Sequence, residues 1–562
     1  MIVGIDLGTT NSLIGAYTDK GAVLFPNPLG DVLTPSVVSV DADGGMLIGQ
    51  GARDRLVTHP ERSVAAFKRW MGSGRETSLG NKRFRPEELS ALVLRSLISD
   101  AEAALGEKVT EAVISVPAYF SDAQRKATRA AGQLAGITVE RLINEPTAAA
   151  LAYGLQERKD GGRFLVFDLG GGTFDVSIIE LFEGVVEVHA SAGDNFLGGE
   201  DFLELLVQTC ASDLKLDLAS LTPGELGQLR HRLERAKREL TSSNSVRTEF
   251  SAGGKQHAWQ LDEDRFTTLA EPLVQRLRGP LERAMRDAKL EPGQLDEIVL
   301  VGGASRMPVV ARMVSRMFGR LPLRHVNPDQ AIALGAVVAA GMKARDTRLE
   351  EVILTDVCPY TLGTEVAKRD PNGEPKWGFY HPIIQRNSTV PVSREDTFWP
   401  TTDEQTRMSV DVYQGENPMV AKNIKLGELI VPLPPGKDRS KKAVTVRYTY
   451  DINGILQVDV TIDATGAKHE LVLEQNPGLL SPEEIRERLA ALAQIKVHPR
   501  QKQENLALIA RAERVYEEQL DAREVVQENI VRFKAVLDTQ DERRIATHRR
   551  EFAQALDNLE HA

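Results

Sequence analysis

The sequence predicts a multidomain protein of class α/β + β + α, in which an α/β part precedes a β part and a helical part. Residues 1–345 alternate strand and helix patterns, as α/β domains do. Residues 357–473 alternate apolar and polar positions with a period of two, which indicates antiparallel strands. Residues 474–562 carry apolar side chains at helical spacing. The length of 562 residues is enough for several domains with cores of their own.

Two stretches of the α/β part share one pattern, an apolar run ending on Asp, a Gly/Thr turn and a second apolar run. The first contains Asp6, Gly8, Thr9, Thr10 and Asn11. The second contains Asp168, Gly170, Gly171, Gly172, Thr173 and Asp175. Each predicts a β-hairpin whose tip offers backbone N–H groups to a phosphate, while the Asp requires a cation between itself and that phosphate. One such turn is usually an ordinary hairpin, but the matched pair predicts two lobes closing on one Mg-nucleotide.

A third Gly-rich turn and a charged helix face are further candidates for the same site. The turn follows the predicted strand 297–301 and contains Gly302, Gly303, Ser305 and Arg306. The guanidinium of Arg306 is suited to stacking on a purine. Helical spacing puts four side chains on one face, namely Glu234, Lys237, Arg238 and Thr241. Taken alone, the turn is a plain strand–helix connection and the helix face is a solvated surface.

The remaining elements follow in chain order. Further strands are predicted over residues 112–116 and 164–168, and helices over 121–134, 147–154, 225–241 and 307–318. Ser121 and Gln124 fit a capping box at the start of the first of these helices. Residues 346–356 are charged and then briefly apolar, which indicates an interdomain linker. In the β part, Asn453-Gly454 joins two alternating runs, 444–450 and 456–462, into a hairpin.

Composition restricts the classes of partner. The net charge of −11 disfavours nucleic acid or an anionic membrane as a partner. No apolar run is long enough to cross a bilayer, and the chain enters a strand at Ile2 without a signal sequence. Cys210 and Cys358 stand in no metal-binding spacing, so we expect two inert thiols in a reducing cytoplasm.

None of the Gly-rich turns is a Walker A sequence. The paired hairpins resemble instead those of the actin, sugar-kinase and heat-shock ATPase superfamily. Four strings narrow the resemblance to the heat shock protein 70 family of DnaK type: residues 116–125, 144–155, 234–240 and 326–329. The resemblance covers essentially the whole chain. It implies an actin-like two-lobed ATPase domain (1–345), a linker (346–356), a β-sandwich peptide-binding domain (357–473) and a C-terminal helical lid (474–562).

The resemblance also assigns roles in the ATPase site. Thr9, Thr10 and Thr173 would contact phosphate, and Lys68 would place the attacking water. Mg²⁺ would be bound by four carboxylates, largely through bridging waters: Asp6, Glu145, Asp168 and Asp175. K⁺ is a possible second ion. Gly8, Asn11 and Gly170 to Gly172 would cradle phosphates. The nucleoside of ATP or ADP would contact Glu234, Lys237, Arg238, Thr241, Gly302, Gly303, Ser305, Arg306 and Asp329.

Beyond the ATPase site, the family's interlobe signal implies roles for Pro117, Arg125 and Asp356. Its peptide groove matches Leu362, Thr364, Phe398, Met408 and Val410, with Ala367 and Thr401 arching over the bound peptide. Each of these residues taken singly is equally typical of a sandwich core. The implied partners are unfolded or specific client polypeptides and a J-domain co-chaperone, in a bacterial cytoplasm. The sequence leaves open whether a nucleotide exchange factor acts on the chain.

Some positions depart from the usual family pattern. The linker run Val352-Ile353-Leu354 ends in Thr355 where a fourth aliphatic residue is usual, which should weaken apolar docking. The two residues of the arch differ from those usual in the family. The segment 74–85 lacks a longer insertion that the family carries, and the helical end is shorter than usual. These features resemble the specialised HscC branch of the family.

Three functions follow from these observations. The first is an ATP-hydrolysing chaperone. The second is a metabolic kinase of the same superfamily, which would have no use for residues 357–562. The third is a non-hydrolysing exchange-factor-like partner, which would be expected to have lost hydrolytic residues.

Overall fold

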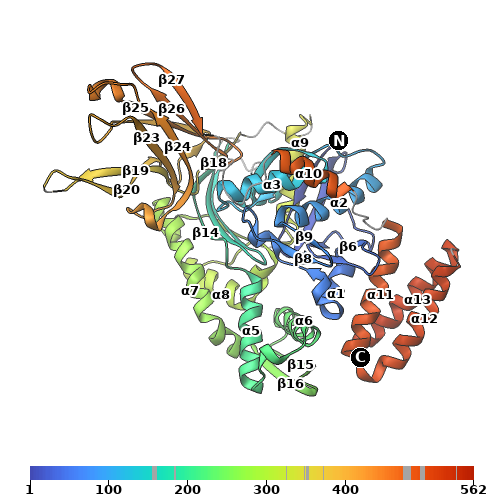
Figure 1. Cartoon of the computed structure of the whole chain (residues 1–562). Coiled ribbons are helices and arrows are strands. Elements are labelled where there is room, and N and C mark those ends of the chain that lie inside the picture. The colour runs from blue at the N-terminus through green and yellow to red at the C-terminus, as the bar shows by residue number, and fades with distance from the viewer. Residues whose placement is uncertain are drawn as a thin grey trace.

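The computed structural model describes residues 1–154, 161–182, 185–323, 326–346, 349, 353–370, 372–471, 482–493, 500–539 and 541–561. Val352 of the predicted linker and Leu155 lie outside these residues. In Figure 1, a β domain stands at one end, a C-terminal helical bundle stands at the other, and a two-lobed body lies between them. In the described part of the chain, none of the helices combines the length and apolarity that a membrane crossing needs.

Lobe I is built on a mixed sheet of order β11-β10-β1-β2-β3, with β4 paired to β2. The strands are β1 (Ile2–Asp6), β2 (Asn11–Thr18), β3 (Gly21–Leu24), β4 (Thr34–Pro35), β10 (Glu111–Val116) and β11 (Thr138–Asn144). Its helices are α1 (Gln50–Thr58), α2 (Pro86–Leu105), α3 (Asp122–Ala135) and α9 (Ala331–Lys343). Small sheets add β5 (Val38–Val40), β6 (Met46–Ile48), β7 (Ser63–Val64), β8 (Thr77–Leu79) and β9 (Lys82–Phe84).

Lobe II is built on a second sheet, of order β17-β12-β13-β14-β18-β21. Its strands are β12 (Gly162–Leu169), β13 (Phe174–Phe182), β14 (Val185–Asp194), β17 (Glu297–Val301), β18 (Ile353–Val357) and β21 (Thr389–Val390). The helices are α4 (Glu145–Ala152), α5 (Gly199–Leu214), α6 (Pro223–Glu239), α7 (Glu263–Asp287) and α8 (Pro308–Phe318), and β15 (Ser245–Ala252) pairs with β16 (Lys255–Asp262). Large apolar side chains such as Phe167, Phe174 and Phe202 form its main core.

The predicted strands and helices of both lobes are present, with small shifts at their ends. The predicted capping box of α3 is confirmed: Ser121 N–H donates to Gln124 Oε1 at 3.0 Å, and Gln124 N–H donates to Ser121 Oγ at 3.4 Å. The helix predicted from residue 147 begins at Glu145, because Pro146 is accommodated in a first helical turn. The helix predicted to reach Thr241 ends at Glu239.

The β part is a sandwich of two four-stranded sheets, β20-β19-β23-β24 and β22-β25-β26-β27. Its strands are β19 (Leu362–Arg369), β20 (Pro375–Ile384), β22 (Val392–Phe398), β23 (Arg407–Gln414), β24 (Ile424–Pro432), β25 (Val444–Tyr450), β26 (Leu456–Ile462) and β27 (Ala467–Leu471). The predicted hairpin at Asn453-Gly454 is confirmed, with Tyr450 opposite Leu456. Between the sheets, the buried Tyr448 hydroxyl donates to the Gly363 carbonyl at 3.0 Å.

The end of the predicted linker is a strand of lobe II rather than a free connection. Ile353 to Thr355 pair in parallel with Val185 to Glu187 of β14, and Asp356 pairs with Val390. Without β18, β14 would be an edge strand with unpaired backbone N–H and C=O groups. Strand β18 forms hydrogen bonds with these groups. Thr355 Oγ1 donates to the Val186 carbonyl at 3.4 Å, so this side chain has a polar contact within the docked strand. The predicted domain boundaries stay a prediction.

The β domain also docks directly on both lobes. Its turn residue Asn453 accepts hydrogen bonds from Arg125 Nη1 at 3.3 Å and, through Oδ1, from Leu142 N–H at 3.1 Å. On lobe II, Arg386 donates to both carboxylate oxygens of Asp287, at 2.8 and 2.9 Å. A bidentate pair of this kind fixes orientation as well as position.

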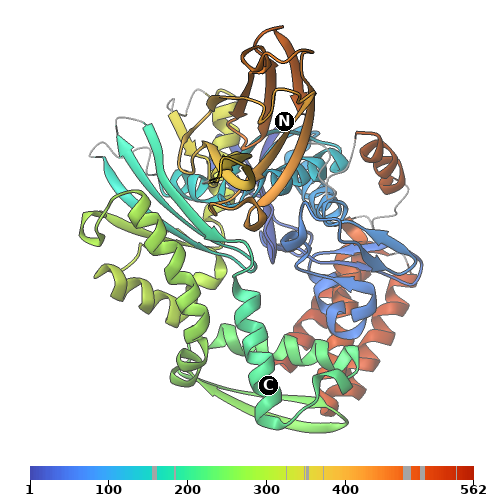
Figure 2. The ribbon, with the colours of Figure 1, turned by 60° about the vertical axis from the view of Figure 1, so that its left-hand side comes forward.

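The C-terminal helices lie on the ATPase lobes, whereas they were expected to close over the β domain. Helix α10 (Pro482–Ala493) places Ile485 against the lobe I core, and Arg488 pairs with Glu88. Helices α11 (Arg500–Glu518), α12 (Arg523–Asp538) and α13 (Glu542–His561) form a bundle around Phe533 and Phe552. Amphipathic spacing shows that a helix face is buried without showing what covers it, so the sequence did not indicate this position on the lobes. Figure 2 shows the bundle beside lobe I and away from the β domain.

The docking of the β domain can be tested at its turn. A Cβ on Gly454 would stand 2.7 Å from Arg125 Cδ, and the φ of 73° adds backbone strain. Gly454→Ala should therefore undock the β domain and increase the radius of gyration in small-angle X-ray scattering. Gly466→Ala is the matched control, because φ is 67° there and an added Cβ meets nothing within 4 Å. Both variants share a strain of about 1 kcal/mol, so equal radii would contradict this prediction.

Candidate active site

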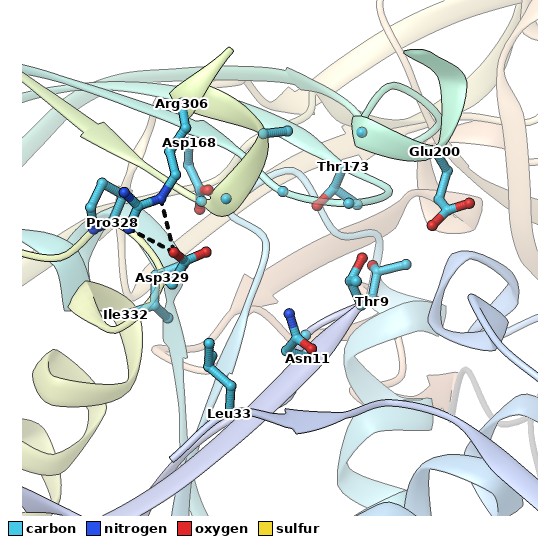
Figure 3. A pocket seen from close by; sticks show the side chains of 18 of the residues that line it. Thr9, Asn11, Leu33, Asp168, Thr173, Glu200, Arg306, Pro328, Asp329 and Ile332 are labelled. Atoms are coloured by element: carbon cyan, nitrogen blue, oxygen red, sulfur yellow. Dashed lines mark hydrogen bonds and ion pairs between the residues drawn. The ribbon is translucent and has the colours of Figure 1, made fainter. Parts of the chain in front are cut away.

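A cavity of about 310 Å³ lies between the two lobes and collects most of the predicted site residues (Figure 3). Both hairpin tips, α6 and the turn after β17 contribute to its walls. The predicted residues that line it are Asp6, Gly8, Thr9, Thr10, Asn11, Lys68, Glu145, Asp168, Gly170, Gly171, Thr173, Glu234, Lys237, Arg238, Thr241, Gly302, Gly303, Arg306 and Asp329. Three predicted residues, Gly172, Asp175 and Ser305, are not part of this lining.

The two hairpin tips meet in space. Strands β1 and β2 present Thr9 and Thr10, and strands β12 and β13 present Gly171 and Thr173 from the other lobe. A Cβ on Gly171 would stand 1.8 Å from Thr10 Oγ1, so only glycine permits this approach. The tips therefore place hydroxyl groups and glycine backbone of both lobes around one space, as phosphate binding requires.

A buried lysine stands among buried carboxylates beside these tips. Lys68 Nζ is 3.0 Å from Glu145 Oε1, and both side chains are less than a tenth exposed. Asp6 Oδ1 accepts from Ser115 Oγ at 2.8 Å, and Asp175 Oδ1 accepts from Tyr119 N–H at 2.8 Å. The cluster thus has more carboxylates than cations in a site sheltered from water.

The pKa values of these carboxyls reflect that imbalance. Burial, reinforced by the nearby Glu145 carboxylate, raises the pKa of Asp6 to about 7. The same two causes raise the pKa of Asp175 to about 7. They also raise the pKa of Asp168 well above its ordinary range. A cation bound here would lower all three pKa values.

The donor set fits a hydrated divalent cation. Asp168 Oδ2 and Asp175 Oδ2 are buried and have no protein hydrogen-bond partner among the described residues. Within the same residues, no three His, Cys, Asp or Glu side chains converge closely enough to bind a metal directly. Mg²⁺ commonly keeps several of its waters, and waters can bridge an ion to carboxylates set back from it.

The far end of the cavity is shaped by charged pairs and a glycine. Arg306 Nε donates to Asp329 Oδ2 at 2.9 Å, which fixes its guanidinium beside the cavity (Figure 3). Glu234 pairs with Lys237 at 2.6 Å and with Arg238 at 2.7 Å. Gly302 has φ of 80°, and a Cβ there would stand 2.3 Å from the Leu169 carbonyl oxygen. Glycine at position 302 therefore lets this turn pack directly against the end of β12. Ser305 holds the turn in place by donating to the Gly302 carbonyl at 2.7 Å.

Sequence reasoning missed several wall residues, namely Leu13, Leu33, Gly199, Glu200, Ala304, Met307, Pro328 and Ile332. Pro328 and Ala304 adjoin predicted site residues in the sequence, so their position next to a motif could have identified them. Gly199 is tied to the site because Lys237 Nζ donates to its carbonyl at 2.8 Å. Arg69 also bridges the lobes, pairing with Asp201 at 3.1 Å, and no local pattern identifies it.

The predicted interdomain residues gather where the β domain meets the lobes. Arg125 is buried and donates to the Ala118 carbonyl at 3.0 Å and to Asn144 Oδ1 at 2.8 Å, besides its bond to Asn453. Asp356 of β18 accepts from Thr147 Oγ1 at 2.9 Å. The Pro117 carbonyl accepts from Phe120 N–H at 3.1 Å, in the same loop as Ala118.

The predicted peptide-binding residues mostly lie in the sandwich core. Leu362, Met408 and Val410 are buried in that core, and Phe398 packs against it. Thr364 is buried, with Oγ1 donating to the Asp411 carbonyl at 2.8 Å. Ala367 and Thr401 are partly exposed. These positions therefore match the alternative sandwich-core interpretation, and their contact with peptide stays a prediction.

Comparison with known proteins identifies the family. Residues 2–78 and 74–562 match the family model described as Hsp70 protein. This chain belongs to the Hsp70 family. The Chaperone protein DnaK of Thermotoga maritima is 40% identical over 529 residues, covering 91% of this chain and 86% of the relative. The Chaperone protein DnaK of Thermosipho africanus is 42% identical over 488 residues, covering 84% of this chain and 79% of the relative.

Membership of the Hsp70 family agrees with the architecture of a two-lobed ATPase, a β-sandwich and a C-terminal helical region. It makes this chain a chaperone ATPase of DnaK type. These relatives support the family, and they give no support to the narrower HscC branch.

The raised carboxyl pKa values of this Hsp70 chain predict a pH-dependent stability. An aspartate with a raised pKa favours folding below pH about 4, and that contribution is lost as pH rises to about 7. In EDTA, the free energy of unfolding of Asp175→Asn relative to that of the wild type should therefore increase from pH 5 to pH 8, by on the order of 2 kcal/mol. Denaturant-induced unfolding of both proteins at both pH values measures this difference. Exposed Asp403→Asn is the control, and an equal gain in both variants would contradict the prediction.

Proposed function

We propose that this chaperone uses Mg-ATP in the interlobe cavity to control how its β domain binds and releases extended apolar segments of client polypeptides. The observation that carries the proposal is that lobe II's carboxylate-bearing hairpin and strand β18 belong to one sheet. A change of hairpin position on hydrolysis would therefore be transmitted through β14 to the start of the β domain.

In the proposed ATPase reaction the chain positions groups and neutralises charge, as phosphoryl transfer demands. Thr9, Thr10 and Thr173 would donate hydroxyl hydrogen bonds to phosphate oxygens. Lys68, held by Glu145, would orient the attacking water and stabilise charge on the γ-phosphate. Bound Mg²⁺ would supply further charge neutralisation, held largely through water by Asp6, Asp168 and Glu145.

We propose that the nucleoside contacts the remaining cavity residues. Arg306 and Arg238 would lie against the base, with Asp329 and Glu234 holding their guanidinium groups in place. The phosphate-binding site would be completed by Gly8, Asn11, Gly170 and Gly172. Asp175, which is not part of the cavity lining, would interact with the cation from a more buried position.

The proposed signal to the β domain runs through Pro117, Arg125 and Asp356. Arg125 is placed to respond to lobe movement because it bonds lobe I and the β domain at once. The carboxyl of Asp356 has a raised pKa through burial, so separating β18 from lobe II would expose an ionisable group to water.

For the client site, we propose that Leu362, Thr364, Phe398, Met408 and Val410 become accessible to peptide when the sandwich opens, beneath the arch of Ala367 and Thr401. Extended peptides bind such sites by strand-like hydrogen bonds plus side-chain pockets. Thr355 and the altered arch favour a specialised member, such as the HscC branch, with a narrow client range. A J-domain co-chaperone and a bacterial cytoplasmic location belong to the same proposal.

The alternatives are less well supported. A metabolic kinase has no use for a β-sandwich joined to its sheet by a strand. A non-hydrolysing exchange-factor-like partner would not need to keep Lys68, Glu145, Asp168 and Thr173 around one cavity.

Substitution of the phosphate-facing residues tests the ATPase assignment. Thr173→Ala and Lys68→Ala should each reduce steady-state hydrolysis by at least about a hundredfold, because the transition state loses a preorganised hydroxyl donor in the first variant and a positive charge in the second. Nucleotide binding, measured by calorimetry, should remain detectable. Lys108→Ala serves as control, since it removes only an exposed ion pair with Glu102. Unchanged hydrolysis in both site variants would sink the assignment.

Peptide release tests the chaperone assignment and separates the three functions. A fluorescent apolar peptide should bind in ADP and dissociate faster after ATP is added, because ATP shifts the β domain to its open state. Stopped-flow anisotropy measures the two rates. Failure to bind peptide in any nucleotide state would favour the exchange-factor-like function, and phosphate transfer to a small hydroxylated substrate would favour the kinase.

A further inference from the structure

The C-terminal bundle contacts lobe I through helix α1. Leu506 of α11 packs against an apolar cluster that includes Leu47 and Ala52. A Cβ on Gly51 of α1 would stand 3.1 Å from Ala507 Cα, so the two helices approach closely at small residues. The helix pair is therefore a packed interface rather than a loose contact.

The same bundle contacts lobe II through helix α6. Arg232 Nη2 donates to the Glu518 carbonyl at 3.3 Å, and Arg235 Nη2 donates to the Glu560 carbonyl at 3.2 Å. Gln228 Nε2 donates to the Glu517 carbonyl at 3.5 Å. These carbonyls belong to the C-terminal turns of α11 and α13, where helices leave acceptors unsatisfied. The bundle thus bridges both lobes.

Arg514 of α11 is the centre of this bridge. Its Nε is 2.9 Å from Asp54 Oδ1 of α1, and its Nη1 is 2.9 Å from Glu518 Oε2 of the bundle. It also pairs with Glu560 of α13, and it lies 3.5 Å from His231 Nε2 of α6. Arg514 is 8% exposed and Asp54 is 1% exposed, so the pair is shielded from solvent. Removing Asp54 would leave Arg514 its carboxylate partners in the bundle, Glu518 and Glu560, and would break the buried ion pair that joins the bundle to α1.

Helices α1 and α6 are also linked to the nucleotide cavity. Arg53, the neighbour of Asp54, donates from Nη2 to Asn11 Oδ1 at 2.9 Å, and Asn11 lines the cavity. Helix α6 contributes Glu234, Lys237 and Arg238 to the cavity wall. The two helices approach each other directly, since a Cβ on Gly227 of α6 would stand 2.6 Å from the Leu56 carbonyl oxygen.

We propose that the bundle α11–α13 is an intramolecular clamp, latched by the Arg514–Asp54 ion pair, that holds α1 and α6 together and slows release of the bound nucleotide. The clamp rests on the proposed function, because a nucleotide in the cavity is what it retains. Coupling between two sites is reciprocal, so a bound nucleotide in turn favours the docked bundle.

The test compares one lobe-side variant with one bundle variant in the full-length chain. Asp54→Asn removes the latch from α1 and leaves the Arg514 pairs with Glu518 and Glu560 inside the bundle. Arg549→Gln is the matched control, because Arg549 pairs with Glu504 within the bundle and is not part of the latch. Dissociation of a fluorescent ADP analogue with Mg²⁺, chased by excess ADP in stopped flow, should be about tenfold faster in Asp54→Asn and within about twofold of the wild type in Arg549→Gln.

Three outcomes would decide against the clamp. Equal dissociation rates for Asp54→Asn and the wild type would overturn it while leaving the proposed function intact. No binding of the analogue by the wild type would overturn the proposed function and the clamp together. Amide hydrogen exchange gives an independent check: Mg-ADP should slow exchange in α11 of the wild type, and this protection should fall in Asp54→Asn. Equal protection in both proteins would also count against the clamp.

Discussion

Backbone pairing between β18 and β14 is the constraint on which the rest of the arrangement depends. It places the start of the β domain in the same sheet as the hairpin that carries Asp168 and Asp175. Once β18 is fixed there, Asn453 reaches Arg125 on lobe I and Arg386 reaches Asp287 on lobe II. Each of these contacts alone is a modest interaction, and together they orient the β domain relative to both lobes.

The interlobe cavity brings together carboxyl groups whose negative charges are unfavourable when no cation is bound. The carboxyls of Asp6, Asp168 and Asp175 are all buried, and their pKa values are all raised. In their ionised form these groups destabilise the protein without ligand, and a bound hydrated cation would relieve that destabilisation. Ligand binding and lobe closure are therefore favoured by the same electrostatic relief. The proposed clamp adds a second, mechanical contribution to closure at α1 and α6.

Much of the fold followed from local patterns in the sequence. The two Asp/Gly/Thr hairpins, the capped helix at Ser121 and the turn at Asn453-Gly454 are all encoded within a dozen residues, which is why they were predictable. Strand β18 was not predictable, because its partner β14 lies more than a hundred residues away in the sequence and its five residues are too few to show a period. The position of the C-terminal helices on the lobes did not follow from the sequence for a related reason, since Arg514 and Asp54 are far apart in the chain and meet only in the folded protein. Beside the site, Arg53 and Arg69 were missed because nothing adjacent to them in sequence marks their partners, Asn11 and Asp201, which lie far away along the chain.

Strand β18 has one further consequence, for the chain's susceptibility to cleavage. Proteases bind their substrates as extended strands and need free backbone groups along them. In β18 those groups are already engaged, by β14 at Ile353 to Thr355 and by β21 at Asp356 and Val357. The segment that joins the domains is thus protected only for as long as it remains a strand of lobe II. Any state of the molecule that separates β18 from lobe II also exposes the backbone groups of this connection to proteases.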